Sequence, residues 1–148
     1  MQKDAGFIDL GSGDGVAVLE AARRGLNARG VELNPTLVLM SRFAAWRNRR
    51  SIETAGGTAL FITGNLFDFN FQVFNNTKPL TIMIFGVVPI MSKVGKKIVT
   101  EGPRDIVILS HKFVIPIETG LKEIDIIDDI RIYTRIENSK DFKNEFLQ

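Results

Sequence analysis

The segment that most constrains the fold is a short apolar run that passes directly into a glycine-rich turn. Residues 7–10 read Phe-Ile-Asp-Leu, and residues 11–15 read Gly-Ser-Gly-Asp-Gly. Residues 16–24 then carry apolar side chains at helical spacing. A strand, a glycine turn and a helix in this order predict the first unit of an α/β fold built on a parallel sheet.

The rest of the hydrophobic pattern extends this unit. We expect strands at residues 28–33, 58–63, 80–85 and 105–110, and helices at residues 34–50 and 89–100. The run at 80–85 is continuously apolar, which predicts a strand covered on both faces. Residues 123–127 and 130–136 alternate apolar and polar side chains, which is typical of an antiparallel hairpin. The expected fold is a mostly parallel sheet with helices on both faces and a C-terminal antiparallel hairpin.

The composition excludes several kinds of chemistry. The chain has 148 residues, no cysteine and a single histidine, His111, so disulfides, thiolate zinc sites and cysteine nucleophiles are excluded and a Ser-His-Asp triad is disfavoured. We predict no metal site. The longest strongly apolar run, residues 79–92, is shorter than the ~20 residues of a membrane-spanning helix. The net charge of +2 predicts neither nucleic-acid nor membrane binding, but residues 1–50 hold eight Lys and Arg against five Asp and Glu, which is a weak indication of an acidic partner.

The glycine turn and the acid that ends the next strand predict a nucleoside site. Glycines at 11, 13 and 15 permit a tight turn and let a ligand approach main-chain N–H groups. Glu32 ends the following strand, where a carboxylate of a doubly wound sheet can accept both ribose hydroxyl hydrogens of an adenosine. Asn65 follows the third strand and could pair with the adenine edge, although Asn after Gly is also an ordinary turn residue.

Two cofactors compete for this arrangement. A dinucleotide fingerprint needs the spacing G-x-G-x-x-G, whereas residues 11–15 have G-x-G-x-G. Asp9 and Asp14 would also place negative charge beside a phosphate. Carboxylates at such a turn suit a ligand with an ammonium or sulfonium centre, which favours S-adenosylmethionine.

Four segments carry a resemblance to a known family. They are residues 9–15 (DLGSGDG), 30–35 (GVELNP), 41–47 (SRFAAWR) and 84–87 (IFGV). In order and spacing they resemble the small seven-strand lysine methyltransferases that act on the ATP synthase c subunit and the adenine nucleotide translocase in mitochondria, which have prokaryotic relatives. The resemblance covers roughly residues 7–135. It implies a Rossmann-like class I methyltransferase domain at residues 1–137 and a polar C-terminal tail at residues 138–148.

The resemblance also implies a set of S-adenosylmethionine-binding residues. They are Asp9, Gly11, Ser12, Gly13, Asp14, Gly15, Glu32, Leu33, Asn65, Leu66 and Phe85. Within this set, Asp9, Gly11, Gly13 and Asp14 would line the methionine portion and Glu32 would hold the ribose. Family members carry an acid where Asn65 stands.

No dedicated catalytic nucleophile is expected, because lysine methylation depends on placing a neutral amine in line with the methyl group. Phe85, Gly86 and Trp46 are candidates for the walls of the lysine channel. The helical spacing of Trp46 from Arg42 and Arg50 favours a packing role instead. His111 could face the same crevice, although the simpler interpretation is a hydrogen-bonded histidine at the end of a strand.

The resemblance implies a protein substrate with a target lysine, membrane proteins included. It places the protein in mitochondria if the source is eukaryotic and in the cytoplasm if it is prokaryotic. Nucleic acid is not expected as a partner, because the loop after the fourth strand lacks the Asn/Asp-Pro-Pro-aromatic sequence of amino-group methyltransferases of nucleic acids. The alternative is a catalytically silent methyltransferase-like subunit with a structural or assembly role, since the family's N-terminal segment is missing and Val88-Pro89 is apolar.

Overall fold

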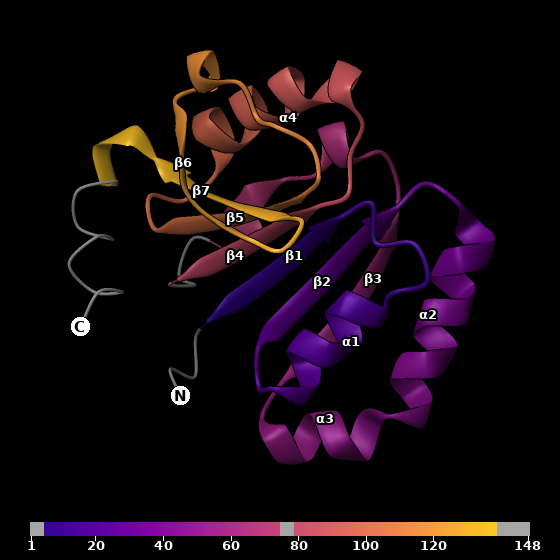
Figure 1. The fold of residues 1–148 in the computed structure, drawn as a ribbon. Helices are drawn as coiled ribbons and strands as arrows, with labels where there is room; N and C mark the ends of the chain where they lie inside the picture. Colours follow the sequence, from indigo (N-terminus) through magenta and orange to yellow (C-terminus); the bar gives the residue numbers. More distant parts are fainter. Residues whose placement is uncertain (1–4, 75–78, 139–148) are drawn as a thin grey trace.

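Seven strands form one twisted sheet in the order β3-β2-β1-β4-β5-β7-β6 (Figure 1). The computed structural model describes residues 5–74 and 79–138. The parallel strands are β1 (Gly6–Leu10), β2 (Asn27–Glu32), β3 (Thr58–Thr63), β4 (Leu80–Ile84) and β5 (Ile106–His111). The antiparallel strands are β6 (Leu121–Ile127) and β7 (Ile130–Arg135). The predicted mostly parallel sheet with a C-terminal hairpin is therefore confirmed.

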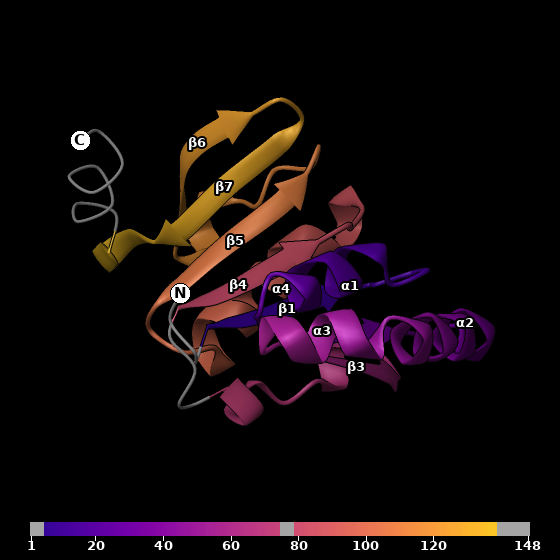
Figure 2. The same cartoon turned by 90° about the horizontal axis from the view of Figure 1, so that it is seen from below.

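The helices divide between the two faces of the sheet (Figures 1 and 2). They are α1 (Val16–Arg23), α2 (Pro35–Arg47), α3 (Arg49–Ala55) and α4 (Val88–Glu101), with short 3-10 turns η1 (Leu66–Asp68), η2 (Phe71–Phe74), η3 (Ile117–Thr119) and η4 (Ile136–Asn138). One apolar cluster joins α1, α2 and α3 to Phe7 and Phe61 of the sheet. A second cluster joins α4 to Ile8, Ile82 and Ile108, which face the other way because side chains alternate along a strand.

The central strand β4 is covered less evenly than its apolar sequence predicts. Leu80, Ile82 and Ile84 are fully buried on the α4 side. Thr81 and Met83 point to the opposite face and are only half-buried. On that face Met83 packs against the apolar cluster of α1, α2 and α3, while Thr81 and Met83 both stay partly exposed. The expectation that both faces of this strand are covered therefore holds fully for the α4 face and only in part for the other.

The single helix expected at residues 34–50 is two helices. Asn34 begins α2 by accepting the N–H of Thr36 on its side-chain oxygen at 2.9 Å, ahead of Pro35 at the first helical position. Asn48 ends α2, and its side-chain amide donates to the carbonyl of Ala44 at 2.8 Å. An Asn side chain that bonds the backbone competes with the helical pattern, so the chain changes direction there and α3 begins at Arg49.

The C-terminal hairpin is fastened to the rest of the domain by one buried arginine. Arg135 ends β7, and its guanidinium donates to the carbonyls of Val99 at 2.9 Å, Gly102 at 2.8 Å and Pro103 at 3.0 Å. These carbonyls lie at the C-terminal end of α4, where intrahelical partners run out. Arg135 therefore caps α4 from the last strand of the sheet.

The described residues end at Asn138. The predicted polar tail at residues 138–148 lies outside the described residues except for Asn138, the last residue of η4. Within residues 5–74 and 79–138, none of the helices combines the length and the hydropathy that crossing a bilayer requires.

Candidate functional site

The carboxyl ends of β1 and β2 meet at the glycine turn, and Glu32 ties the two together. Its Oε2 accepts the N–H of Gly13 at 2.9 Å, and its Oε1 accepts the N–H of Asn34 at 2.9 Å. Each carboxylate oxygen keeps a further lone pair. Glu32 is therefore fixed in orientation while it can still accept a hydrogen bond from a ligand.

Asp9 lies beneath the same turn and is almost completely buried, with 6% of its surface exposed. Its Oδ1 has no hydrogen-bond partner among the described residues. Burial, and then the negative charges of Glu32 and Asp14, raise the pKa of Asp9 from 3.8 to about 7. A buried carboxylate without a partner is costly, so this group is poised to meet a cation.

Asp14 completes a set of three carboxylates around the turn. It is exposed, and its Oδ1 accepts the N–H of Val16 at 3.3 Å in the first turn of α1. Its charge is one of the two that raise the pKa of Asp9. Asp9, Asp14 and Glu32 together favour a cationic ligand and disfavour a phosphate.

The glycines of the turn have two different roles. Gly13 adopts φ +53°, and a Cβ built on it would meet nothing within 4 Å, so a side chain there would enter the open space beside the turn, here called the crevice. Gly15 adopts φ +79°, and a Cβ there would lie 2.6 Å from the Phe61 ring and 2.7 Å from the Ser41 hydroxyl. Gly15 is thus required by packing, whereas Gly13 keeps the crevice open.

The turn does not present its N–H groups as the sequence predicts. The N–H groups of Gly11 and Ser12 both donate to the carbonyl of Val31, at 2.9 and 3.0 Å. Gly15 donates to the carbonyl of Ser12 at 2.8 Å, and Gly13 donates to Glu32. These four N–H groups are therefore satisfied within the chain, and the charged groups that the turn offers a ligand are carboxylates.

The side chain of Ser12 lies on the sheet side of the turn. Its side chain is buried and packs against β2, where a Cβ on Gly30 would lie 2.6 Å from its Oγ. The hydroxyl has no hydrogen-bond partner among the described residues. The structure therefore turns the Ser12 side chain toward the sheet, so any contact with a ligand would be made by its backbone.

The residues expected around adenine lie at the neighbouring strand ends. Leu33 follows β2 and is 66% exposed. Asn65 follows β3, and its side-chain oxygen accepts the N–H of Phe67 at 3.0 Å, so it begins η1 as a turn residue. Leu66 is half-buried against the larger core. The turn role of Asn65 is confirmed, and contact of these residues with adenine stays a prediction.

The carboxyl ends of β4 and β5 carry an aromatic pair. Phe85 is 62% exposed, and its ring stacks on His111 with centroids 4.9 Å apart and planes 16° apart. The Nδ1 of His111 is buried and has no hydrogen-bond partner among the described residues. The interpretation of His111 as a hydrogen-bonded strand-end histidine is therefore wrong for this nitrogen. In the sequence, only the position of His111 at the end of the fifth predicted strand indicated that it could lie near Phe85.

The other two candidates for the channel wall, Gly86 and Trp46, do not take part in this aromatic pair. Gly86 is buried, and a Cβ on it would lie 2.7 Å from the Met91 sulfur, so it serves the packing of α4. Trp46 lies near the C-terminal end of α2, close to Asn48, whose side-chain oxygen accepts a hydrogen bond from Arg23 at the end of α1. That end of α2 is remote from the carboxyl edge of the sheet, so the structure does not support Trp46 as a channel wall.

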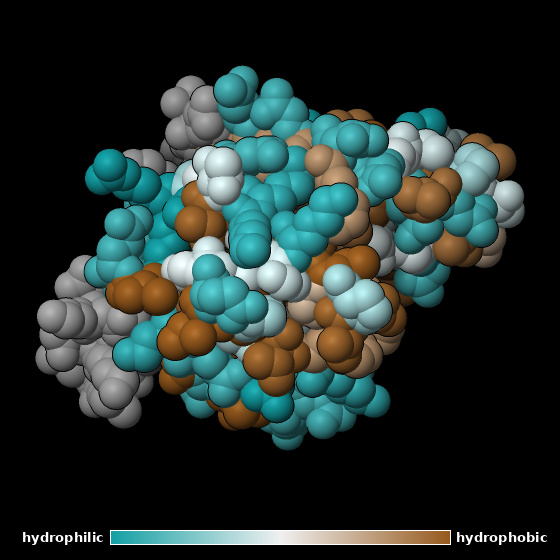
Figure 3. All heavy atoms as spheres, turned by 90° about the horizontal axis from the view of Figure 1, so that it is seen from above, coloured by the Kyte–Doolittle hydropathy of each residue, from teal (hydrophilic) through white to brown (hydrophobic). Residues whose placement is uncertain are grey.

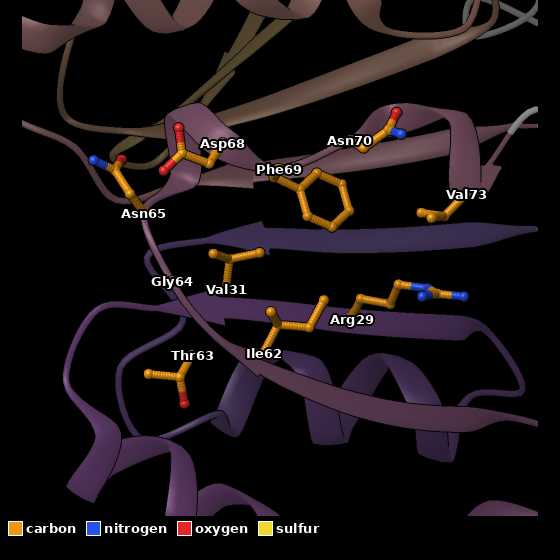
Figure 4. Close-up of a pocket in the computed structure, with 10 residues that line it drawn as sticks. All are labelled: Arg29, Val31, Ile62, Thr63, Gly64, Asn65, Asp68, Phe69, Asn70 and Val73. Atoms are coloured by element: carbon orange, nitrogen blue, oxygen red, sulfur yellow. The ribbon is translucent and has the colours of Figure 1, made fainter.

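A separate hollow of about 340 Å³ lies on the opposite face of the sheet, between β2, β3 and the η1–η2 segment (Figure 4). Its apolar middle is formed by Val31, Ile62 and Phe69, with Asn65 at one end and Arg29 at the other. Arg29 places its guanidinium 5.4 Å from the centre of the Phe74 ring. Strand alternation puts this hollow on the face away from Asp9, so it is distinct from the crevice at the glycine turn.

The part of the chain that the structure describes contains no cluster of side chains that could bind a metal ion. No group of three or more His, Asp or Glu side chains lies close enough together to hold an ion there.

Comparison with known sequences gives consistent matches. The family model of the ANTKMT methyltransferase domain matches residues 9–120. The ATP synthase c-subunit lysine N-methyltransferase of Homo sapiens is 38% identical over 110 residues, which are 74% of this chain and 43% of that protein. The adenine nucleotide translocase lysine N-methyltransferase of Mus musculus is 57% identical over 42 residues, which are 28% of this chain and 18% of that protein. The chain thus spans less than half the length of these relatives.

Solved structures share the fold. An RNA methyltransferase from Salinibacter ruber, crystallised with S-adenosyl-L-homocysteine, has a TM-score of 0.69 and 23% identity and covers 90% of this chain and 82% of its own. PKMT2 from Rickettsia typhi, in complex with AdoHcy, has a TM-score of 0.60 and 15% identity and covers 78% of this chain and 22% of its own. At these identities the likeness concerns the fold alone.

Proposed function

Because the chain belongs to the ANTKMT methyltransferase domain family, we propose that it transfers a methyl group from S-adenosylmethionine to a lysine side chain of a membrane protein. The observation that carries this proposal is the group of three carboxylates at the glycine turn, with Asp9 buried and its Oδ1 without a partner among the described residues. Such a site has an excess of negative charge that a cationic cofactor would neutralise.

The residues present fit this cofactor. Its ammonium and sulfonium groups suit the carboxylates of Asp9 and Asp14, and Glu32 has lone pairs left for ribose hydroxyls. The open space at Gly13 leaves room against the backbone. Leu33 and Asn65 would flank the adenine, where the Asn65 amide can donate a hydrogen bond. When bound, S-adenosylmethionine supplies a methyl group activated by attachment to a positively charged sulfur.

The acceptor lysine would approach beside the aromatic pair. A Cβ on Gly11 would lie 3.9 Å from the Phe85 carbonyl, so the end of β4 borders the turn. The stacked rings of Phe85 and His111 form a flat surface along which an aliphatic side chain packs and over which an ammonium group is attracted. The chain's part in the reaction is to orient the amine and exclude water, and it needs no nucleophile of its own.

The names of the relatives support a proposal for the acceptor. They are lysine methyltransferases of the ATP synthase c subunit and of the adenine nucleotide translocase. We infer a membrane-protein acceptor of this kind, which would place the protein in mitochondria in a eukaryote. Protein rather than nucleic acid is the proposed substrate.

Calorimetric titration with S-adenosylmethionine and S-adenosylhomocysteine tests the cofactor site. We expect both to bind, and Glu32→Ala to weaken binding by about 5- to 150-fold, as the loss of a charged hydrogen-bonding group worth roughly 1–3 kcal/mol implies. Glu53→Ala, an exposed acid on α3, is the matched control and should bind normally. A folded protein that binds neither compound would favour the alternative of a catalytically silent structural subunit.

A transfer assay then tests the acceptor. The detergent-solubilised c subunit of ATP synthase is offered with its lysines intact or replaced by arginine, and incorporation is read by mass spectrometry. Mass gain in steps of one methyl group on the lysine form alone is expected. Equal incorporation into the arginine form, or into RNA, would contradict the proposed substrate.

A further inference from the structure

Helix α2 carries apolar side chains on its outer surface as well as on its inner one. Inside, Val38 and Ser41 are buried against the sheet. Outside, Leu39 is 68% exposed, Met40 and Phe43 are 57% exposed and Trp46 is 58% exposed. These four outer residues are here named the α2 face: Leu39, Phe43 and Trp46 follow one another four and three positions apart along one stripe of the helix, and Met40 lies three positions before Phe43. Among residues 5–74 and 79–138, the stripe is therefore an unpartnered apolar surface and not part of the core.

The aromatic part of the α2 face is held in a fixed arrangement. The rings of Phe43 and Trp46 stack with centroids 5.7 Å apart and planes 27° apart. The guanidinium of Arg49 lies over the Trp46 ring at 5.2 Å, and its Nη1 donates to the Trp46 carbonyl at 3.2 Å. An arginine that lies across an aromatic ring keeps its charge at the margin of the apolar surface.

The charged side chains of α2 and of the start of α3 are all of one sign. Between Glu32 and Glu53 the sequence contains no acid and four arginines, at positions 42, 47, 49 and 50. Arg42 donates to the carbonyl of Phe61 at 2.9 Å, which turns it toward the sheet. Arg47, Arg49 and Arg50 are exposed at the C-terminal end of the face. The surface thus combines aliphatic and aromatic side chains with a cationic margin.

The shape of this surface favours a lipid bilayer over a folded protein as its partner. In Figures 1 and 2, α2 forms the outermost edge of the molecule, and Figure 3 shows apolar side chains among polar ones at the same end. A helix at the edge of the molecule can place its apolar stripe in a bilayer interface without needing a groove of its own. Exposed Leu, Met, Phe and Trp side chains beside arginines are the composition of helices that lie in the headgroup region of anionic membranes.

We propose that the α2 face binds the surface of a lipid bilayer that contains anionic headgroups, with Leu39, Phe43 and Trp46 entering the interface and the arginines contacting the headgroups. This binding is separate from methyl transfer and needs neither cofactor nor acceptor. It therefore holds or fails independently of the proposed function.

The test uses the whole chain with vesicles and no cofactor. Trp46 is the sole tryptophan, so its fluorescence reports directly on the α2 face. Vesicles of phosphatidylcholine with phosphatidylglycerol should shift its emission to the blue and sediment with the protein, and raising the salt concentration should weaken both effects. Vesicles of phosphatidylcholine alone should bind less.

Variants that retain Trp46 identify the residues responsible. The double variant Leu39→Ser, Phe43→Ser should lower partition onto anionic vesicles at least about tenfold. Replacing Arg47 and Arg50 by Gln should lower it about fivefold for each charge. Matched controls are Ile117→Ser with Ile127→Ser, at 68% and 56% exposed positions elsewhere, and Lys96→Gln on α4.

Three results would overturn the proposal. The first is a folded protein that does not bind anionic vesicles at low salt. The second is an equal loss of binding in the control variants. The third is a blue shift that grows with protein concentration in the absence of vesicles, because a second copy of the chain would then cover the α2 face.

Discussion

The glycine turn and the α2 face depart from the usual partition of polar and apolar groups in opposite directions. At the turn, the carboxylate of Asp9 and the hydroxyl of Ser12 are buried and have atoms without partners among the described residues. On α2, Phe43 and Trp46 are more than half exposed. Both arrangements disfavour folding, since burial without hydrogen bonds and exposure without apolar contact each cost free energy. Each therefore points to something outside the chain.

The two regions also differ in charge, although one loop joins them. Glu32 ends β2 beside the glycine turn, and Asn34, whose N–H donates to Glu32, begins α2 two residues later. Carboxylates gather on the turn side and arginines on the α2 side. The difference indicates that the glycine turn suits a cationic ligand that enters the fold, whereas the α2 face suits an anionic surface that stays outside it.

The largest effect is expected at Gly13. Gly13→Val should abolish cofactor binding, because the side chain would fill the open crevice, while the strain of a β-branched residue at φ +53° costs on the order of 1–2 kcal/mol of stability. Titration calorimetry and thermal unfolding measure the two effects. Gly56→Val is the matched control, since Gly56 has φ +75° and a Cβ on it would also meet nothing within 4 Å.

The same pair of variants separates the two regions. Gly13→Val and Gly56→Val should both leave vesicle binding by the α2 face unchanged. A loss of vesicle binding in Gly13→Val alone would show that the turn and the α2 face act as one site, which would break the comparison. If a folded Gly13→Val protein still binds the cofactor, the space beside Gly13 is not the cofactor site.

The next effect concerns the pH dependence of stability. The pKa of Asp9 is raised to about 7, so the folded state binds this proton more tightly than the unfolded chain does. The associated stabilisation is fully present below the ordinary carboxyl pKa of 3.8 and is lost as the pH rises to about 7. Asp9→Asn should remove this dependence and stabilise the cofactor-free protein at pH 8 by up to about 4 kcal/mol.

Denaturant unfolding at several pH values measures the Asp9 effect. Asp129→Asn, at an exposed acid in the hairpin, is the control and should follow the parent protein. The same Asp9→Asn variant should bind S-adenosylmethionine more weakly, so stability and binding should move in opposite directions. If Asp9→Asn neither gains stability at pH 8 nor loses affinity for S-adenosylmethionine, the Asp9 carboxylate does not serve to bind a cation.

The smallest effect is expected at Asn65. Asn65→Asp should change cofactor affinity by only a fewfold, because the side chain remains a turn former while its donor is lost, and unfolding should hardly shift. Asn70→Asp makes the same change at an equivalent turn, where Asn70 accepts the N–H of Gln72 at 2.9 Å. If the affinity for the cofactor is unchanged in both variants, the role of Asn65 is only to form the turn.

The sheet could be predicted from the sequence because it rests on local patterns. The continuous apolar runs at β4 and β5 and the alternation at β6 and β7 are each visible within six or seven residues. The break at Asn48 was not visible, because it depends on a side-chain bond to Ala44 that competes with an otherwise helical pattern.

The site could be predicted in its position but not in its hydrogen bonding. The glycine turn and Glu32 lie together as expected, yet the N–H groups of the turn are used by Val31, Ser12 and Glu32, which only the folded chain brings into reach. The packing role expected of Trp46 is wrong for a related reason, since this residue is 58% exposed. An apolar stripe at helical spacing looks the same in sequence whether it faces the core or the solvent, and on α2 the inner stripe is the one that contains Val38.

The arginine that ends β7 has a consequence for how the protein is made. A chain on the ribosome grows from its amino end, so β1 to β5 and α4 exist before Arg135 is added. Until then the carbonyls at the end of α4 have only water for partners, and the edge of β5 is open to pairing with other chains. The hairpin thus completes this part of the fold only after β1 to β5 and α4 have been synthesised, and a nascent protein that stops short of residue 135 would be a target for chaperones and proteases.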